Sequence, residues 1–243
     1  MFVDNVVGHV NRAFDRIVIV IATLCFLICT YALIDTIHVY YHANDNSLLA
    51  FRPDFDSDTN KLGKLSKECI AWIKVKKTKI DYPVMQGEDN SKYLNMDPYG
   101  EYSLSGSIFL DYRNNPAFTD DYSLLYGHHM EQGAMFGALD KYLNEDYFNK
   151  HRDGWIKTNK NKKYKIKFFA VLEGQATNTL IFAPTTTSLN ELNQYITKHA
   201  KYYDNTPSKS QKIIALSTCK YPDTEDRIII FGHLEEAKWK NDI

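Results

Sequence analysis

Short apolar runs alternate with polar turns along most of the chain after residue 64. The clearest pair lies at 213–219 and 227–231, where two runs rich in β-branched residues flank a polar segment. Runs of about four to eight such residues between turn formers are typical of β-strands. The same pattern predicts strands at 71–75, 80–86, 106–112, 123–129, 155–158 and 164–172, and Pro83 marks the second of these as an edge or irregular strand.

Helical spacing is confined to a few inserted segments. Apolar residues recur three and four positions apart within 133–143, which predicts a helix there. Ser188 followed by Glu191 is the capping-box pattern, and it predicts a helix from 188 to about 203. Short helices are also expected near 64 and at 91–95. Many short strands with a few helices favour a mostly β fold, a closed or nearly closed barrel.

The most apolar stretch of the chain is 17–34, which has 18 residues and no charge. At about 1.5 Å per residue it spans roughly 27 Å, close to the thickness of a bilayer core. Arg12 and Arg16 precede it, so the positive-inside rule places the N-terminus in the cytoplasm. A secretory signal peptide is the alternative, but no A-x-A-like site follows the run. We therefore expect a single-pass membrane protein with four parts: a cytoplasmic N-terminus (1–16), a transmembrane anchor (17–34), a juxtamembrane stalk or helix (35–63) and an extracellular domain (64–243).

Composition also bears on the fold class and on the kinds of partner to expect. The 243 residues suffice for one domain plus an appendage, and 17 Tyr and 13 Phe suit a β-rich domain. The charge balance, 29 basic against 30 acidic residues, gives no electrostatic reason to expect binding to nucleic acid.

The four cysteines divide between the two parts of the chain. Cys25 and Cys29 lie inside the apolar span, which leaves Cys69 and Cys219 on the exported side. A secreted domain of this size with two cysteines is not a disulfide scaffold. The apolar neighbours of Cys69 favour a buried thiol over a bridge, so Cys219 is the candidate free thiol.

The candidate chemistry lies at strand ends. Cys219 ends one expected strand, Arg227 begins the next, and the strand 123–129 stops at histidine. A thiol, an imidazole and a guanidinium can serve as nucleophile, proton shuttle and oxyanion partner. A thiol of ordinary pKa, about 8.5, is only a few per cent ionised near neutrality, so a neighbouring imidazolium would help by stabilising the thiolate. The simpler alternatives are a buried strand-end cysteine and an ion pair of Arg227 with Asp223, Glu225 or Asp226.

Several spaced motifs together resemble one family. The segments 216–219 and 126–128 and Arg227 resemble the catalytic cysteine, histidine and arginine motifs of bacterial sortases. Four further stretches, 72–86, 89–94, 106–114 and 133–139, match in the same order, and the last two, with the helix before 213, favour class B. The resemblance covers roughly residues 65–234 and implies an eight-stranded sortase-type β-barrel that uses no metal or cofactor.

The resemblance also implies a reaction. Cys219 would attack a backbone carbonyl, typically after Thr, in the C-terminal sorting signal of a secreted protein and form a thioacyl-enzyme. An amine would then release the acyl group. That amine belongs to a cell-wall precursor peptide, which anchors a surface protein, or to a lysine of the next pilin, which builds a pilus. The sequence leaves both roles open.

The family pattern assigns roles to particular positions. The catalytic histidine directly follows Gly127, which selects His128, with His129 as the reversed alternative. The implied catalytic set is His128, Cys219 and Arg227, and the implied substrate-binding positions are Asn90, Leu94, Tyr195, Ile196 and Ser217. Lys220 departs from the family, in which acidic residues are common after the cysteine, and this bears on substrate preference.

Other functions fit the residues less well. Papain-like and cell-wall amidase cysteine enzymes place the cysteine before the histidine, whereas here His128 comes first. A metal site would need His128, His129 and His233, but adjacent histidines do not form the usual i, i+4 pair of ligands. A non-enzymatic, membrane-tethered binding module would require Cys219 and His128 to be incidental.

Overall fold

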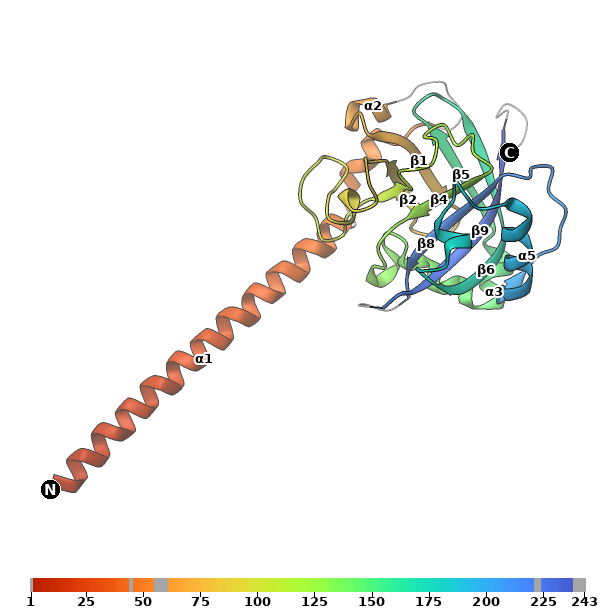
Figure 1. Ribbon diagram of the computed structural model, residues 1–243. Helices are drawn as coiled ribbons and strands as arrows, with labels where there is room; N and C mark the ends of the chain where they lie inside the picture. Colours follow the sequence, from red (N-terminus) through yellow and green to blue (C-terminus); the bar gives the residue numbers. More distant parts are fainter. Residues whose placement is uncertain (1, 44–45, 55–60, 221–223, 238–243) are drawn as a thin grey trace. The chain divides into compact units, whose positions relative to one another are not determined.

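The computed structural model describes residues 2–43, 46–54, 61–220 and 224–237, in two units that divide after His42 (Figure 1). The first unit consists of the helix α1 (Phe2–Ala43) up to His42, and the segment Asn11–Ile37 of this helix is long and apolar enough to cross a membrane. The hydroxyls of Thr23, Thr30 and Thr36 each donate to a carbonyl four residues earlier, so these three groups have hydrogen-bond partners within the helix. The length and composition of this span fit either a membrane anchor or a signal sequence.

In the second unit, one mixed sheet closes on itself. Its strands are β1 (Cys69–Val75), β2 (Asp81–Met85), β3 (Ile108–Leu110), β4 (Tyr122–Tyr126), β5 (Asp153–Thr158), β6 (Lys163–Gln175), β7 (Tyr202–Tyr203), β8 (Ile213–Cys219) and β9 (Asp226–Glu236). They pair in the order β5-β1-β2-β3-β4-β8-β9-β6, and β5 pairs with β6 to close the ring, while β7 adds to β6 outside it. The predicted eight-stranded barrel is therefore confirmed. Two neighbouring pairs are parallel, β2 with β3 and β4 with β8.

The strands that carry the expected chemistry are buried on both faces. Along β8, Ile214 and Leu216 belong to the larger core cluster, whereas Ile213 and Ala215 belong to a second cluster on the other face. Residues of α4 and α5 contribute to the second cluster, including Ile181 and Leu192. Two-sided burial explains why β8 and β9 read as continuous apolar runs instead of alternating ones.

Short helices precede the first strand and connect the later ones. They are α2 (Leu62–Leu65), α3 (Glu145–Lys150), α4 (Thr179–Phe182) and α5 (Leu189–His199), with 3-10 turns at η1 (Asn46–Phe51), η2 (Lys92–Leu94), η3 (Glu131–Gly133) and η4 (Gly137–Leu143). The expected stalk, 35–63, thus contains the end of α1 and η1, and its residues 44–45 and 55–60 lie outside the described part of the chain.

Three local predictions need correction. The helix expected at 133–143 begins only at Gly137, as a 3-10 helix, because Gly133 and Met135 adopt positive φ and interrupt it. The helix expected to reach 203 ends at His199, since Tyr202 and Tyr203 pair with β6 instead. β2 has partners on both sides, so it is not an edge strand; however, Pro83 pairs only with β1, because the pairing with β3 begins at the next residue.

Candidate active site

Strand pairing brings the three expected catalytic side chains to one rim of the barrel. Cys219 ends β8 directly opposite Arg227 of β9 in the antiparallel register. β4 runs parallel to β8 with Tyr126 beside Ser217, and the amide of Gly127 donates to the Ser217 carbonyl at 3.2 Å. Continuing this register places His128 on the strand end next to that of Cys219, and neighbouring strands lie about 4.8 Å apart.

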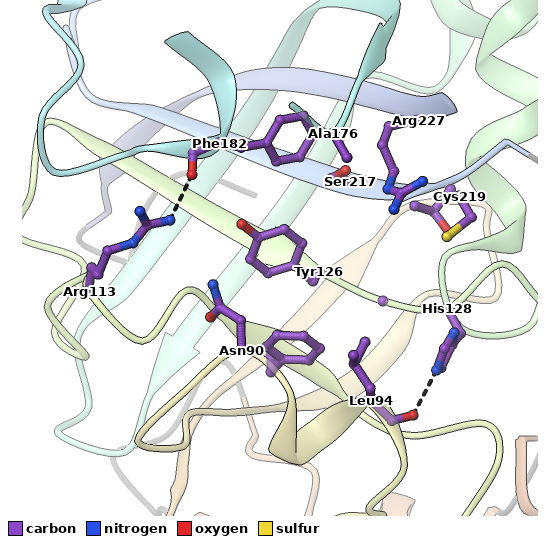
Figure 2. A pocket seen from close by; sticks show the side chains of 13 residues that line it. Asn90, Leu94, Arg113, Tyr126, His128, Ala176, Phe182, Ser217, Cys219 and Arg227 are labelled. Carbon is purple, nitrogen blue, oxygen red and sulfur yellow. Dashed lines mark hydrogen bonds between the residues drawn. The ribbon is translucent and has the colours of Figure 1, made fainter. Parts of the chain in front are cut away.

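These residues line a cavity of about 340 Å³. Figure 2 shows the Cys219 sulfur beside the Arg227 guanidinium, with His128 projecting from the neighbouring strand end. The lining comprises six residues named from the sequence, Asn90, Leu94, His128, Ser217, Cys219 and Arg227, and seven others, Phe109, Arg113, Tyr126, Gly127, Ala176, Phe182 and Thr218. A thiol, an imidazole and a guanidinium around one cavity have the composition that acyl transfer requires.

The two adjacent histidines have different partners. Nε2 of His128 lies 2.7 Å from the carbonyl oxygen of Leu94. Because a carbonyl only accepts, this nitrogen carries the proton, and Nδ1 is the nitrogen left for proton transfer. His129 instead bonds with the carboxylate of Asp140 at 2.7 Å. Of the two, His128 lines the cavity.

The guanidinium of Arg227 is held by backbone carbonyls. Nη1 donates to the carbonyl oxygens of Thr224 at 2.7 Å and of Asp226 at 3.1 Å. Within the part of the chain that the structure describes, it forms no ion pair with the carboxylates of Glu225 or Asp226, and the carboxylate of Asp226 accepts from the Gln175 amide instead. Asp223, the third acid considered above, lies outside the described residues. The charge of Arg227 is therefore not neutralised by these two acids.

The cysteines of the second unit differ in exposure. Cys219 is half-buried and forms no disulfide. Cys69 is fully buried, as expected, and burial raises the pKa of its thiol to about 12. Lys220, the residue after Cys219, forms an ion pair with Glu173 of β6, with 3.0 Å between Nζ and Oε1. Its positive charge is thus balanced by the barrel.

Three of the five expected substrate-binding residues lie at the cavity. Leu94 is exposed there, and the hydroxyl of Ser217 is buried without a hydrogen-bond partner among the described residues. The side-chain amide of Asn90 already forms two hydrogen bonds within the protein, since it donates to Asp111 at 2.9 Å and accepts from the Tyr112 backbone amide at 3.0 Å.

The other two expected positions, Tyr195 and Ile196, lie on α5 and do not line this cavity. Ile196 is fully buried in the second core cluster, and the Tyr195 ring stacks on His199 with 4.2 Å between centroids. In their place, α4 supplies Phe182, whose ring stacks on Tyr126 with centroids 6.4 Å apart. A helix of four residues is too short to show a periodic pattern by which the sequence could reveal it.

Comparison with known proteins identifies the family. The family model for the sortase domain matches residues 73–235. Sortase B of Listeria monocytogenes is 36% identical over 181 residues, covering 71% of this chain and 72% of that protein. Sortase B of Staphylococcus aureus is 33% identical over 199 residues and 75% of each chain.

Solved structures agree with this. A class B sortase of Streptococcus pyogenes involved in pilus biogenesis is 42% identical, with a TM-score of 0.66, covering 72% of this chain and 96% of that one. The S. aureus sortase B–substrate complex is 29% identical, with a TM-score of 0.66, covering 77% and 87%. The chain therefore belongs to the sortase family of cysteine transpeptidases, and within it to class B.

Proposed function

We propose that this class B sortase cleaves the C-terminal sorting signal of a secreted protein, after Thr, and joins the new carboxyl end to an amine of a cell-wall precursor peptide. Such a reaction would anchor a surface protein to the wall. The observation that carries the proposal is the juxtaposition of Cys219, Arg227 and His128 on three neighbouring strand ends around one cavity.

The residues divide the first half-reaction between them. The thiolate of Cys219 attacks the carbonyl carbon, and the negative charge that develops on the oxygen is stabilised by donors of Arg227. His128, as the imidazolium, gives its proton to the leaving nitrogen while the C–N bond breaks. The products are a thioacyl-enzyme, a free amine on the departing peptide and a neutral His128.

The second half-reaction reverses these roles. Neutral His128 takes a proton from the incoming amine as its nitrogen attacks the thioester carbon. The C–S bond breaks, the new amide forms and the thiolate returns. The bond of His128 Nε2 to the Leu94 carbonyl supports this cycle, because it holds the ring in one orientation in both protonation states.

The cavity suits an extended peptide. The unpaired hydroxyl of Ser217 needs a hydrogen-bond partner, and a peptide backbone in the cavity would supply one. Leu94 offers an exposed apolar side chain, and Asn90 shapes the wall through its bonds to Asp111 and Tyr112. We assign these three residues to the binding of the sorting signal.

We further propose that α1 is an uncleaved, single-pass anchor with the barrel on the extracellular side. Its span Asn11–Ile37 contains the apolar run 17–34 with Arg12 and Arg16 before it. Positive residues at the N-terminal end favour a cytoplasmic N-terminus. The enzyme would then meet its secreted substrates at the outer face of the membrane.

A second candidate role is the joining of pilin subunits through a lysine amine. It is favoured by the 42% identity to the S. pyogenes class B sortase involved in pilus biogenesis, against 29% for the S. aureus sortase B–substrate complex. Both roles pass through the same thioacyl-enzyme and differ in the amine that resolves it.

The test uses the full chain in detergent micelles with a library of sorting-signal peptides, followed by mass spectrometry. We expect an acyl adduct on Cys219 that is abolished in Cys219→Ala and His128→Ala and retained in Cys69→Ala. Wall-type peptides and lysine-containing pilin peptides are then offered in competition, and the amine that is consumed distinguishes the two roles. A Cys219 that reacts with no peptide and with no small thiol reagent would refute catalysis and favour a binding module.

A further inference from the structure

One wall of the cavity is formed by the single helical turn α4. It presents Phe182 to the cavity, where the ring stacks on Tyr126 of β4 at an interplanar angle of 18°. A helix of four residues is too short to be stable alone. The position of this wall must therefore come from contacts with the barrel.

Two side chains, one from β4 and one from the turn after β3, bind the last carbonyls of α4. The hydroxyl of Tyr122 donates to the carbonyl oxygen of Ile181 at 2.9 Å, and Nη2 of Arg113 donates to that of Phe182 at 2.7 Å. The final carbonyls of a helix lack partners within it, and a cation there is favourable. Arg113 thus fastens the end of α4 that carries Phe182.

Arg113 is itself fixed by a buried carboxylate. Its Nε and Nη2 donate to the two oxygens of Asp111 at 2.8 and 2.7 Å. Asp111 is fully buried and also accepts from Asn90 and from the hydroxyl of Tyr126, each at 2.9 Å. Three residues that line the cavity therefore meet on one carboxylate.

This carboxylate is charged at neutral pH. Burial acts to raise the pKa of Asp111, but the hydrogen bonds from Arg113, Asn90 and Tyr126 outweigh it and leave the pKa below its usual value. The guanidinium of Arg113 consequently has an anionic partner at neutral pH, and two hydrogen bonds to this partner hold its plane in one orientation.

We propose that Arg113, oriented by Asp111, is a positioning residue that latches α4 against the barrel and so fixes the width of the groove for the sorting signal. This role rests on the proposed function, because it concerns the peptide that Cys219 would attack. Figure 2 shows Arg113 and its bond to the Phe182 carbonyl on one side of Tyr126, with Cys219 and Arg227 on the other. The latch therefore acts on peptide binding and not on the thiol.

The proposal predicts a split between binding and chemistry. In single-turnover acylation of Cys219 by the full chain in micelles, we expect Arg113→Gln to raise the half-saturating peptide concentration about tenfold or more, because it removes the charged hydrogen bonds to Asp111 and Phe182. The maximum rate should stay within about twofold. The half-saturating concentration of Arg113→Lys should lie between those of the wild type and Arg113→Gln, because an ammonium keeps the charge but lacks the planar fork of donors.

A second measurement does not depend on any substrate. The amides of Ile181, Phe182 and Ala183 donate the hydrogen bonds that form the α4 turn, and their hydrogen exchange should speed up in Arg113→Gln. The matched control is Arg152→Gln, which removes another arginine–aspartate pair, with Asp204, away from the cavity. It should change neither the exchange of α4 nor the half-saturating concentration.

The outcomes separate the two ideas. Unchanged exchange in α4, or an unchanged half-saturating concentration, would overturn the latch. So would an equal loss of acylation rate and of Cys219 alkylation by a small thiol reagent, since that pattern reports general damage. If the wild-type chain is alkylated but never acylated, the proposed function fails, while the exchange of α4 still decides whether Arg113 holds this wall.

Discussion

Gly127 connects the last residue of β4 to His128, and the structure leaves no room there for a side chain. A Cβ at this position would lie 2.8 Å from Cδ2 of Phe136 and 2.9 Å from Cδ1 of Ile108, both of which are buried. The Gly127 amide is also tied to the Ser217 carbonyl at 3.2 Å. The substitution Gly127→Ala must therefore displace the backbone that leads to His128 or the packed side chains beside it.

The size of the effect follows from the overlap. A contact of 2.8 Å falls about 0.6 Å short of the 3.4 Å at which ordinary van der Waals contact begins. Overpacking of this kind costs about 1–3 kcal/mol of unfolding free energy. A 1 Å misplacement of a catalytic group can cost about 100-fold in rate, so a shift of about half that size should lower the maximum acylation rate roughly 10-fold.

Two measurements on the full chain check this reasoning. Single-turnover acylation of Cys219 gives the rate, and chemical unfolding gives the free energy. Gly63→Ala is the control, because nothing lies within 4 Å of a Cβ at that helical position. If Gly127→Ala acylates at the wild-type rate, the position of His128 does not depend on the packing beside this glycine, and the reasoning fails.

Three further predictions concern buried and neighbouring groups. Asp111→Asn should lower the free energy of unfolding by about 2–4 kcal/mol at pH 7. Because the pKa of Asp111 is lowered in the fold, the carboxylate stabilises the protein fully above its unfolded pKa, about 4, and progressively less below it. Urea unfolding of both chains at pH 7 and pH 3 should show a smaller difference at pH 3, and an equal difference would contradict the assignment. Within the second unit, a small alkylating reagent at pH 8 should label Cys219 and leave Cys69 unlabelled, because burial raises the pKa of the Cys69 thiol to about 12. Peptide mapping that finds Cys69 labelled first would contradict this. His128→Gln should lower the acylation rate by about 10²–10⁴-fold, whereas His129→Gln and Asp140→Asn should stay within about threefold, and the opposite ranking would assign proton transfer to His129.

The strands that carry the chemistry could be predicted because burial leaves a strong local trace. The runs 213–219 and 227–231 are apolar on both faces, and few structures other than a buried strand give short β-branched runs of this kind. Their pairing then fixes Cys219 opposite Arg227. The pattern of many short strands also favoured a closed or nearly closed barrel, and the pairing of β5 with β6 closes it. The number of eight strands was expected only from the resemblance to sortases.

Helix ends were less predictable because tertiary contacts decide them. The apolar spacing in 133–143 is compatible with a helix, but Met135 adopts a positive φ. A positive φ is uncommon for residues other than glycine, so the sequence does not predict it. The segment after His199 could have continued α5, yet Tyr202 and Tyr203 pair with β6 instead. Ser188 precedes α5 as predicted, although its side chain forms no capping hydrogen bond.

The helix that lines the cavity could not be predicted from local sequence patterns. Leu192 and Ile196 lie four residues apart on α5 and are both buried, so the amphipathic pattern that reveals this helix also commits Ile196 to the core. The wall of the cavity comes instead from α4, which is held by a hydrogen bond between residues 69 positions apart. A contact of that kind has no period and no spacing by which a sequence could reveal it. Strand pairing thus sets the positions proposed for catalysis, whereas the proposed latch of α4 depends on a single long-range hydrogen bond of Arg113. We therefore expect a substitution of Arg113 to alter the groove without disturbing the strands.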